Sequence, residues 1–255
     1  MDIILYNILA SFGCLIIGYF FGSIPFAIII SKAFYHKDVR EFGSHNAGAT
    51  NMGRTFGKKV GILVFLLDVL KTVIPVWSVW AILTFIPFNG QTLLPNAIEV
   101  AQKGFQAFDD HILKFMTYWL TGVGVTIGHC FPIFAHFKGG KGASNMFGIA
   151  VGTSWMFVFV PIILFIVLMK KTKTMSLSVL IACGVGTLTH ITISILTLLK
   201  VLPSIFSYLP GYGPTFTFGL TSSLMILFCY LLVVIRHQAN IIRLKKHEES
   251  KVNLF

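Results

Sequence analysis

A polar, glycine-rich run occupies residues 40–54, between two long hydrophobic segments. It contains five glycines or alanines, several amide and hydroxyl side chains, and an arginine at each end, Arg40 and Arg54. Small residues let backbone N–H groups wrap around phosphate oxygens, and a guanidinium supplies the opposite charge. The run therefore predicts a phosphorylated substrate.

A second glycine-rich run, residues 128–142, ends in Lys138-Gly139-Gly140-Lys141-Gly142. Glycines beside Lys141 let the backbone approach an anion while the ammonium acts as a point charge. Gly142 stands where a nucleotide-binding P-loop has Ser or Thr, so a nucleotide is not implied. The alternative is a tight hairpin whose lysines only set membrane orientation.

Two features lie inside hydrophobic segments. The run Gly22–Phe26 contains Gly and Pro, which interrupt a helix and free backbone groups for a ligand; packing of small residues between helices is the alternative. Asp68 and Lys71 are three residues apart, so they share a helix face and can pair. An ionisable pair within a span predicts a functional site, although a structural ion pair is an equal alternative.

A final polar run begins where the last hydrophobic segment ends, at Arg236-His237. On a helix that continues from the last span, His237 and Asn240 lie on one face, with Arg236 and Arg243 nearby. The alternative is an interfacial helix that its basic residues anchor to anionic lipid.

Composition identifies an integral membrane protein. Hydrophobic residues make up 55% of the chain and charged residues only 11%, against about 25% charged in soluble domains. The formal charge of +11 must then sit in short loops and a tail, which suit lipid headgroups or phosphates and not a nucleic acid. The N-terminal apolar run lacks a basic n-region and is too long for a cleaved signal, so we expect it to remain as the first span.

Spanning helices need about 20 apolar residues. Five stretches qualify: Ile3–Ser31, Val60–Pro87, Ile112–Phe137, Met175–Leu199 and Phe218–Ile235. The stretch Ala143–Met169 is long for one span and short for two. A break near Gly152–Ser154 makes it two and places Lys170, Lys171 and Lys173 with the other basic loops.

The predicted fold is thus an all-α membrane protein with about seven transmembrane helices. With the N-terminus outside and the C-terminus cytoplasmic, nearly all Lys and Arg fall on the cytoplasmic side; the exceptions are Lys71, Lys103, Lys114 and Lys200. All the glycine-rich polar runs fall on that side too, as one cytoplasmic active site requires.

Other chemistries lack their motifs. The eight histidines form no HExxH or similar ligand pair, so we expect neither a metal nor another cofactor. No GxSxG and no defensible triad is present, so a covalent acyl-enzyme is not indicated. The four cysteines lie in separate apolar stretches without metal-ligand spacing, and we interpret them as buried small hydrophobes.

The order and spacing of these runs resemble the bacterial acyl-phosphate-dependent glycerol-3-phosphate acyltransferase family. The resemblance rests on Gly22–Phe26, Gly43–Arg54 with Asp68 and Lys71, Gly128–Gly142, and Arg236–Ile241, and it covers essentially the whole chain. It implies a single acyltransferase domain over residues 1–255, in the bacterial cell membrane, with a cytoplasmic active site.

The implied reaction moves an acyl group from acyl-phosphate to the 1-hydroxyl of glycerol 3-phosphate, giving lysophosphatidic acid and phosphate, the first step of phospholipid synthesis. A soluble phosphate acyltransferase would supply the donor. By motif position, the implied catalytic residues are Ser44, Arg54, Lys141, His237 and Asn240. The implied substrate-binding residues are Gly43, Asn46, Thr50, Asn51, Lys71, Lys138, Gly139 and Gly140.

Acyl-phosphate is already activated, so positioning and charge neutralisation should supply most of the rate. We expect Arg54 and Lys141 to neutralise phosphate, Ser44 with the first loop to orient it, and His237 with Asn240 to engage glycerol 3-phosphate. Either His237 or a substrate phosphate oxygen takes the hydroxyl proton.

The chain departs from the family pattern at His45, where glycine is usual, and at Ala143-Ser144-Asn145, where Val-Ala-Thr is usual. A glycine can adopt positive φ, so His45 would narrow the loop's conformational range. The longer outer loops are a further departure, and we assign them no chemistry.

Two other functions fit less well. A His-x4-Asp acyltransferase is disfavoured because no histidine has an Asp five positions later. A transporter or flippase would predict polar residues across the membrane and repeat symmetry, whereas the polar runs cluster on one side.

Overall fold

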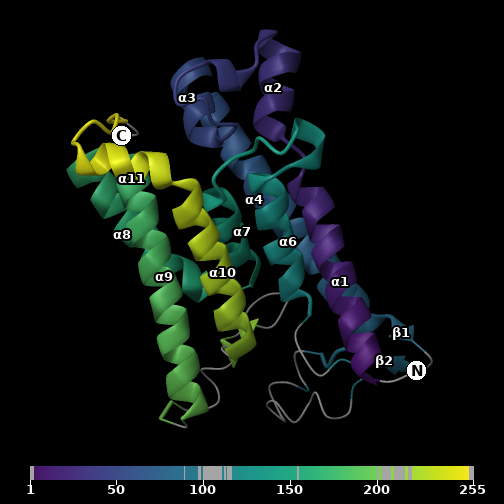
Figure 1. The fold of residues 1–255 in the computed structure, drawn as a ribbon. Coiled ribbons are helices and arrows are strands. Elements are labelled where there is room, and N and C mark those ends of the chain that lie inside the picture. Colours follow the sequence, from purple (N-terminus) through teal and green to yellow (C-terminus); the bar gives the residue numbers. More distant parts are fainter. Residues whose placement is uncertain are drawn as a thin grey trace.

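The computed structural model describes residues 3–252 except 89, 97–98, 100–110, 112, 114–116, 154, 200, 203–207, 210–215 and 218–219. The described part is mostly helical (Figure 1), which confirms the predicted class. Two short antiparallel ribbons join helices: β1 (Pro87–Phe88) pairs with β2 (Gln91–Thr92), and β3 (Tyr208–Leu209) pairs with β4 (Phe216–Thr217).

The first hydrophobic segment is a broken helix. Helix α1 (Ile3–Gly22) ends before Pro25, and α2 (Phe26–Tyr35) begins after it. A proline has no N–H to continue the ladder of hydrogen bonds, and the Pro25 carbonyl instead starts α2 by accepting from Ile28 N and Ile29 N. The predicted interruption at Gly22–Phe26 is confirmed as a break in the helix.

Two helices follow the first polar run. Short α3 (Ala49–Phe56) is amphipathic, and Gly57, at a φ of 102°, turns the chain into α4 (Lys58–Phe85). Helix α4 is 28 residues long and strongly apolar, so it matches the predicted span Val60–Pro87. Asp68 and Lys71 lie near its middle.

The second half of the chain forms α6 (Trp119–Cys130), α7 (Ala143–Thr153), α8 (Trp155–Thr172), α9 (Met175–Leu198), α10 (Leu220–Arg236) and α11 (Gln238–Lys245). The stretch that the sequence divides near Gly152–Ser154 forms two helices: α7 packs against α4 and α8 packs against α9 (Figure 1). Residue 154 itself lies outside the described residues.

Three helical segments of the described chain are long and apolar enough to cross a membrane: Ile4–Tyr35, Lys58–Phe85 and Met175–Leu196. Thr221–Arg236 with Gln238–Lys245, bent by 59°, is a fourth if the pair counts as one span. The segment Trp119–Ala135 is apolar but shorter. Membrane insertion therefore agrees with the sequence, while seven spans and the orientation of the termini stay predictions.

The polar runs gather at one end of the molecule. Helices α2, α3 and α11 and the loop after α6 lie at that end, and the start of α1 with β1 and β2 lies at the other (Figure 1). The cysteines follow the prediction with one exception: Cys14, Cys130 and Cys229 are buried, whereas Cys183 is only partly buried.

Helices α1 and α6 cross at unusually short range because glycines face backbone in both. A Cβ at Gly18 would overlap the Thr121 carbonyl, and one at Gly22 the Val125 carbonyl; reciprocally, Gly124 meets the Leu15 carbonyl and Gly128 the Tyr19 carbonyl. On each helix the two glycines are four residues apart, a spacing typical of close packing between membrane helices. Packing between helices is therefore one role of Gly22, as its alternative interpretation predicted.

This contact predicts a large effect of one methyl group. Gly124→Ala should lower the thermal midpoint of the detergent-solubilised protein strongly, because the methyl meets backbone that cannot rotate away; overpacking typically costs about 1–3 kcal/mol. Gly13→Ala, in α1 with nothing within 4 Å of its Cβ, is the matched control and should leave the midpoint unchanged or raise it. Equal midpoints for the two variants would contradict the packing argument.

Candidate active site

The first polar loop is folded around one buried amide, Asn51, which is 1% exposed. Its Oδ1 accepts from Ser44 N at 2.8 Å, and its Nδ2 lies 2.9 Å from both the Val39 and Phe42 carbonyls and 3.1 Å from the Asn46 carbonyl. Asn51 is the first-turn residue of α3 that ties the loop to that helix. In this structure its side chain therefore holds the loop's shape.

Two residues of this loop have left-handed backbone. Gly43 has a φ of 60°, and a Cβ there would overlap Asn51 Oδ1, so glycine is needed. His45 has a φ of 55°, and its Nδ1 lies 3.0 Å from the Arg40 carbonyl. Histidine is among the residues enriched in this region. His45 thus adopts a positive φ although it is not a glycine.

The second loop, residues 136–142, is closely packed. Gly140 N donates to the His129 carbonyl at 2.9 Å, and a Cβ at Gly139 would overlap that carbonyl and Pro132. Arg236, at the end of α10, donates to the carbonyls of Gly140 (3.1 Å) and Gly139 (3.2 Å). The Gly140 amide is thus engaged within the protein, and Arg236 holds the loop through two of its carbonyls.

Lys141 lies near the end of this loop, where it contacts Asn240 of α11. Its Nζ donates to Asn240 Oδ1 at 2.6 Å, and Asn240 Nδ2 donates to Glu249 Oε1 at 2.7 Å. The Glu249 carboxylate also accepts from Arg243 Nε (2.7 Å) and Ser176 Oγ (2.9 Å), and its side chain is 4% exposed. The loop, α9, α11 and the C-terminal tail therefore meet at one carboxylate.

The charges around Glu249 are mostly positive. Burial lowers the pKa of Lys141 to about 8; Glu249 opposes this effect, and Arg243, Arg54 and Arg236 add to it. Burial would raise the pKa of Glu249, but hydrogen bonds from its partners outweigh burial and lower it. Burial likewise lowers the pKa of Arg54. Several cations around one carboxylate attract further anions.

His237 lies at the junction of α10 and α11, outside both helices, and is 4% exposed. Its Nδ1 lies 2.8 Å from the Val233 carbonyl, so Nδ1 carries the proton and Nε2 keeps a lone pair. Burial lowers the pKa of His237 to about 4, the Val233 bond opposes this, and Lys141 lowers the pKa further. The imidazole is therefore neutral near pH 7.

The structure brings together four of the five predicted catalytic residues: Arg54, Lys141, His237 and Asn240 are linked by the contacts and charges above. Ser44, Asn46 and Thr50 belong to the first loop or the start of α3, within ten residues of Arg54 along the chain. Lys138 is an exposed residue of the second loop. The roles of these residues stay predictions.

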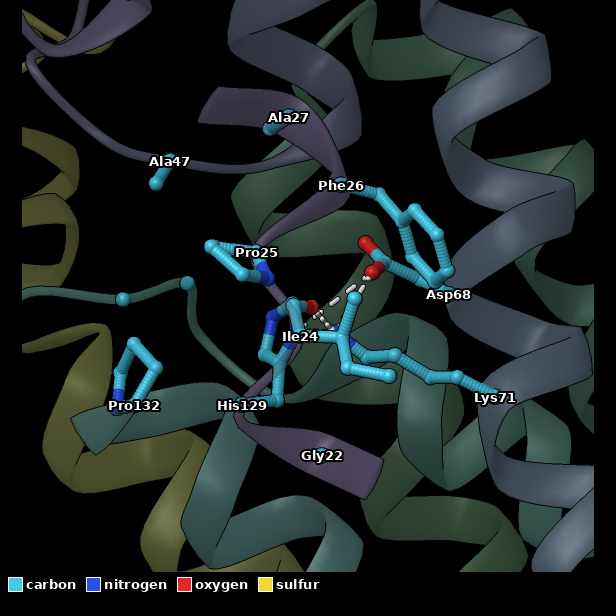
Figure 2. A pocket seen from close by; sticks show the side chains of 12 residues that line it. Gly22, Ile24, Pro25, Phe26, Ala27, Ala47, Asp68, Lys71, His129 and Pro132 are labelled. Carbon is cyan, nitrogen blue, oxygen red and sulfur yellow. Dashed lines mark hydrogen bonds and ion pairs between the residues drawn. The ribbon is translucent and has the colours of Figure 1, made fainter. Parts of the chain in front are cut away.

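Arg54, Lys141, Arg236 and Arg243 form a cation cluster, and Lys71 is not among the cations that lower the pKa of Lys141. Lys71 pairs with Asp68 at 2.9 Å, which confirms the predicted ion pair, and both line a small cavity with His129 (Figure 2). The cavity lies between the break after α1, the middle of α4 and the second loop. Its remaining lining residues are Gly22, Ile24, Pro25, Phe26, Ala27, Ala47, Pro132, Gly139 and Gly140.

The sequence did not identify Glu249 and His129 as candidate site residues. Glu249 follows another acid, Glu248, in a basic tail, and no spacing rule distinguishes the two. His129 stood within the second run, but its contact with Lys71 depends on the crossing of α4 and α6. Within the described residues, no group of three or more His, Cys, Asp and Glu lies close enough to hold a metal ion.

Comparison with known proteins covers nearly the whole chain. The family model for glycerol-3-phosphate acyltransferase matches residues 12–247. The glycerol-3-phosphate acyltransferase of Mycoplasma mobile is 34% identical over 254 residues, 92% of this chain and 90% of its own. Glycerol-3-phosphate acyltransferase 2 of Thermotoga maritima is 34% identical over 241 residues, 94% and 95% of the two chains.

The fold is also similar to two crystal structures of PlsY, an integral membrane glycerol 3-phosphate acyltransferase. Its glycerol 3-phosphate form has a TM-score of 0.67 at 26% identity, over 95% of this chain and 96% of that chain. Its lysophosphatidic acid form has a TM-score of 0.65 at 25% identity, over 95% of each chain. Sequence and fold therefore agree on the same group of proteins.

The coupling of Lys141 to Glu249 can be tested without any substrate. Glu249→Gln removes a carboxylate whose charge raises the pKa of Lys141, so that pKa should fall below about 8. More of the neutral amine is then present at pH 7.5, and labelling by an amine-reactive ester should be faster. Peptide mapping by mass spectrometry across a pH series would measure the midpoint for Lys141 alone.

Glu248→Gln is the matched control, because Glu248 is an exposed neighbouring acid and its removal changes the same net charge. Its Lys141 midpoint should stay close to that of the unmodified protein. An unchanged or raised midpoint in Glu249→Gln would show that Glu249 does not stabilise the ammonium.

Proposed function

The chain belongs to the glycerol-3-phosphate acyltransferase family, and from that premise we propose that it transfers an acyl group from acyl-phosphate to the sn-1 hydroxyl of glycerol 3-phosphate. The products would be lysophosphatidic acid and inorganic phosphate. One observation carries the proposal: three separate polar runs supply Arg54, Lys141, Arg236 and Arg243 to one cluster with Asn240 and His237. Such a cluster suits two anionic substrates.

Charge neutralisation is the main task of the proposed site. Both substrates carry phosphate, and their mutual repulsion must be overcome before the hydroxyl reaches the acyl carbon. Arg54 offers a bidentate guanidinium and Lys141 a point charge, and partial burial strengthens both interactions relative to water. Ser44 and the first loop would orient one phosphate, and Asn240 would help to place glycerol 3-phosphate.

The mixed anhydride is already activated, so no acyl-enzyme is needed. The glycerol oxygen forms a new C–O bond to the acyl carbon, the bond from that carbon to the phosphate oxygen breaks, and phosphate leaves. The hydroxyl proton passes to a phosphate oxygen of a substrate. His237 is a poor proton acceptor near pH 7, because burial lowers its pKa to about 4; its Nε2 would orient the hydroxyl as a hydrogen-bond acceptor.

The setting of the reaction follows from the same proposal. The polar runs gather at one end of the molecule (Figure 1), and the positive-inside rule assigns that end to the cytoplasm of a bacterial cell. A soluble phosphate acyltransferase would deliver acyl-phosphate there, and the apolar helices would accommodate the acyl tail within the bilayer. Seven spans with the N-terminus outside are part of this proposal.

The donor can be tested with purified protein, glycerol 3-phosphate and either palmitoyl phosphate or palmitoyl-CoA. We expect lysophosphatidic acid and phosphate in equal amounts from palmitoyl phosphate alone. Lys141→Ala should lower kcat/KM by about 10²-fold or more, the usual effect of losing one preorganised electrostatic group, whereas Lys59→Met on exposed α4 surface should not. Product from palmitoyl-CoA only would mean a different donor.

The role of His237 can be tested by pH dependence. Phosphate monoesters ionise near pH 6, so both the wild type and His237→Gln should lose activity together as the pH falls through about 6. A base with the ordinary histidine pKa near 6.5 would add an acid limb in the wild type that His237→Gln lacks. If plots of log kcat against pH for the wild type and His237→Gln are parallel, His237 has an orienting role. If the wild type shows an acid limb near pH 6.5 that His237→Gln lacks, His237 is the base.

A further inference from the structure

The three donors of the Lys71 ammonium all have acceptors within the protein. Nζ lies 2.9 Å from Asp68 Oδ1, 3.0 Å from the Ile24 carbonyl and 3.0 Å from His129 Nδ1. An ammonium has three N–H groups and no acceptor capacity. The side chain is only 3% exposed, so these three contacts account for its hydrogen-bonding capacity (Figure 2).

Each acceptor belongs to a different element. Asp68 is one turn away on α4, and Ile24 lies at the break between α1 and α2, where Pro25 interrupts the helix. His129 belongs to the last turn of α6. One ammonium therefore ties together the three segments that precede or support the second glycine loop.

His129 connects Lys71 to the second glycine loop, because it contacts both. Because its Nδ1 accepts from Lys71, its Nε2 carries the ring proton. A Cβ at Gly140 would overlap His129 Nε2, and Gly140 N donates to the His129 carbonyl at 2.9 Å. Both the ring and the backbone of His129 thus touch Gly140, the residue directly before Lys141.

We propose that Lys71 is a positioning residue and not a substrate ligand: with Asp68 and His129 it fixes the second glycine loop, and so places Lys141 in the cation cluster. The inference rests on the proposed function only for its kinetic consequences. It replaces the role implied for Lys71 by motif position. It also accounts for a lysine and an aspartate within a long apolar helix, because each neutralises the other where the loop needs a rigid support.

The proposal is tested with Lys71→Met, Gly140→Ala and the double variant. Gly140→Ala leaves the Asp68–Lys71 charges intact but drives a methyl group into the His129 ring. Both single variants should lower kcat/KM by about 10²-fold, the loss expected when a reacting group is displaced by about 1 Å. Because they disturb one unit, the double variant should be no worse than either single variant.

A second readout reports the loop directly. Lys141 faces Arg54 of α3, Arg236 of α10, His237, Arg243 of α11 and Glu249 of the tail. A loop released from this cluster leaves Lys141 more hydrated, so its labelling midpoint should rise from about pH 8 toward 10 in both variants. Lys59→Met on α4 and Gly13→Ala on α1 are the controls and should leave the midpoint unchanged.

Three results together would overturn the proposal and make Lys71 a substrate ligand. The losses of kcat/KM in the two single variants would multiply in the double variant, the labelling midpoint of Lys141 would not move, and KM would rise in Lys71→Met but not in Gly140→Ala. If Lys71→Met does not fold because Asp68 is left unpaired, Asp68→Asn with Lys71→Met removes both charges and answers the same question. An inactive wild type would refute the proposed function, while the labelling midpoints would still decide the positioning role.

Discussion

The close crossing of α1 and α6 is the contact on which the rest of the site depends. Backbone meets backbone through Gly18, Gly22, Gly124 and Gly128, and the carbonyls that face these glycines cannot move aside by changing a rotamer. This contact fixes the end of α6, with His129, against the end of α1, where the helix breaks. Lys71 of α4 then contacts both helix ends, because its Nζ lies 3.0 Å from the Ile24 carbonyl at the break and 3.0 Å from the His129 imidazole.

The same rigidity solves an electrostatic problem at the polar end of the molecule. Arg54, Lys141, Arg236 and Arg243 repel one another, and flexible side chains would move apart into water. Here Arg236 is held by the carbonyls of the second loop, and Lys141 and Arg243 share the Asn240–Glu249 pair. Fixed cations in a partly buried site need little reorganisation when an anion arrives.

Local rules predicted the parts of this arrangement that lie within one helix. The i,i+3 spacing predicted the Asp68–Lys71 pair, and the proline predicted the helix break. The continuing helix expected at His237 is wrong, because the chain bends by 59° between α10 and α11 at that residue. Contacts between elements were beyond those rules. Nothing in the order of residues shows that Lys71 faces His129, that Glu249 and not Glu248 meets Asn240, or that the Asn51 amide turns toward its own loop.

A sequence pattern typical of phosphate binding also does not show which of its polar groups are free to bind the substrate. Asn51 and Gly140 belong to runs that resemble phosphate loops, and the resemblance implied substrate binding for Lys71. Yet the Asn51 amide, the Gly140 N–H and the Lys71 ammonium each have partners within the protein. A reaction whose donor is already activated gains most from exact placement of a few charges. Polar residues that hold the backbone in place are then as necessary as those that contact the substrate, because they keep Lys141 and Arg54 where two phosphates must meet.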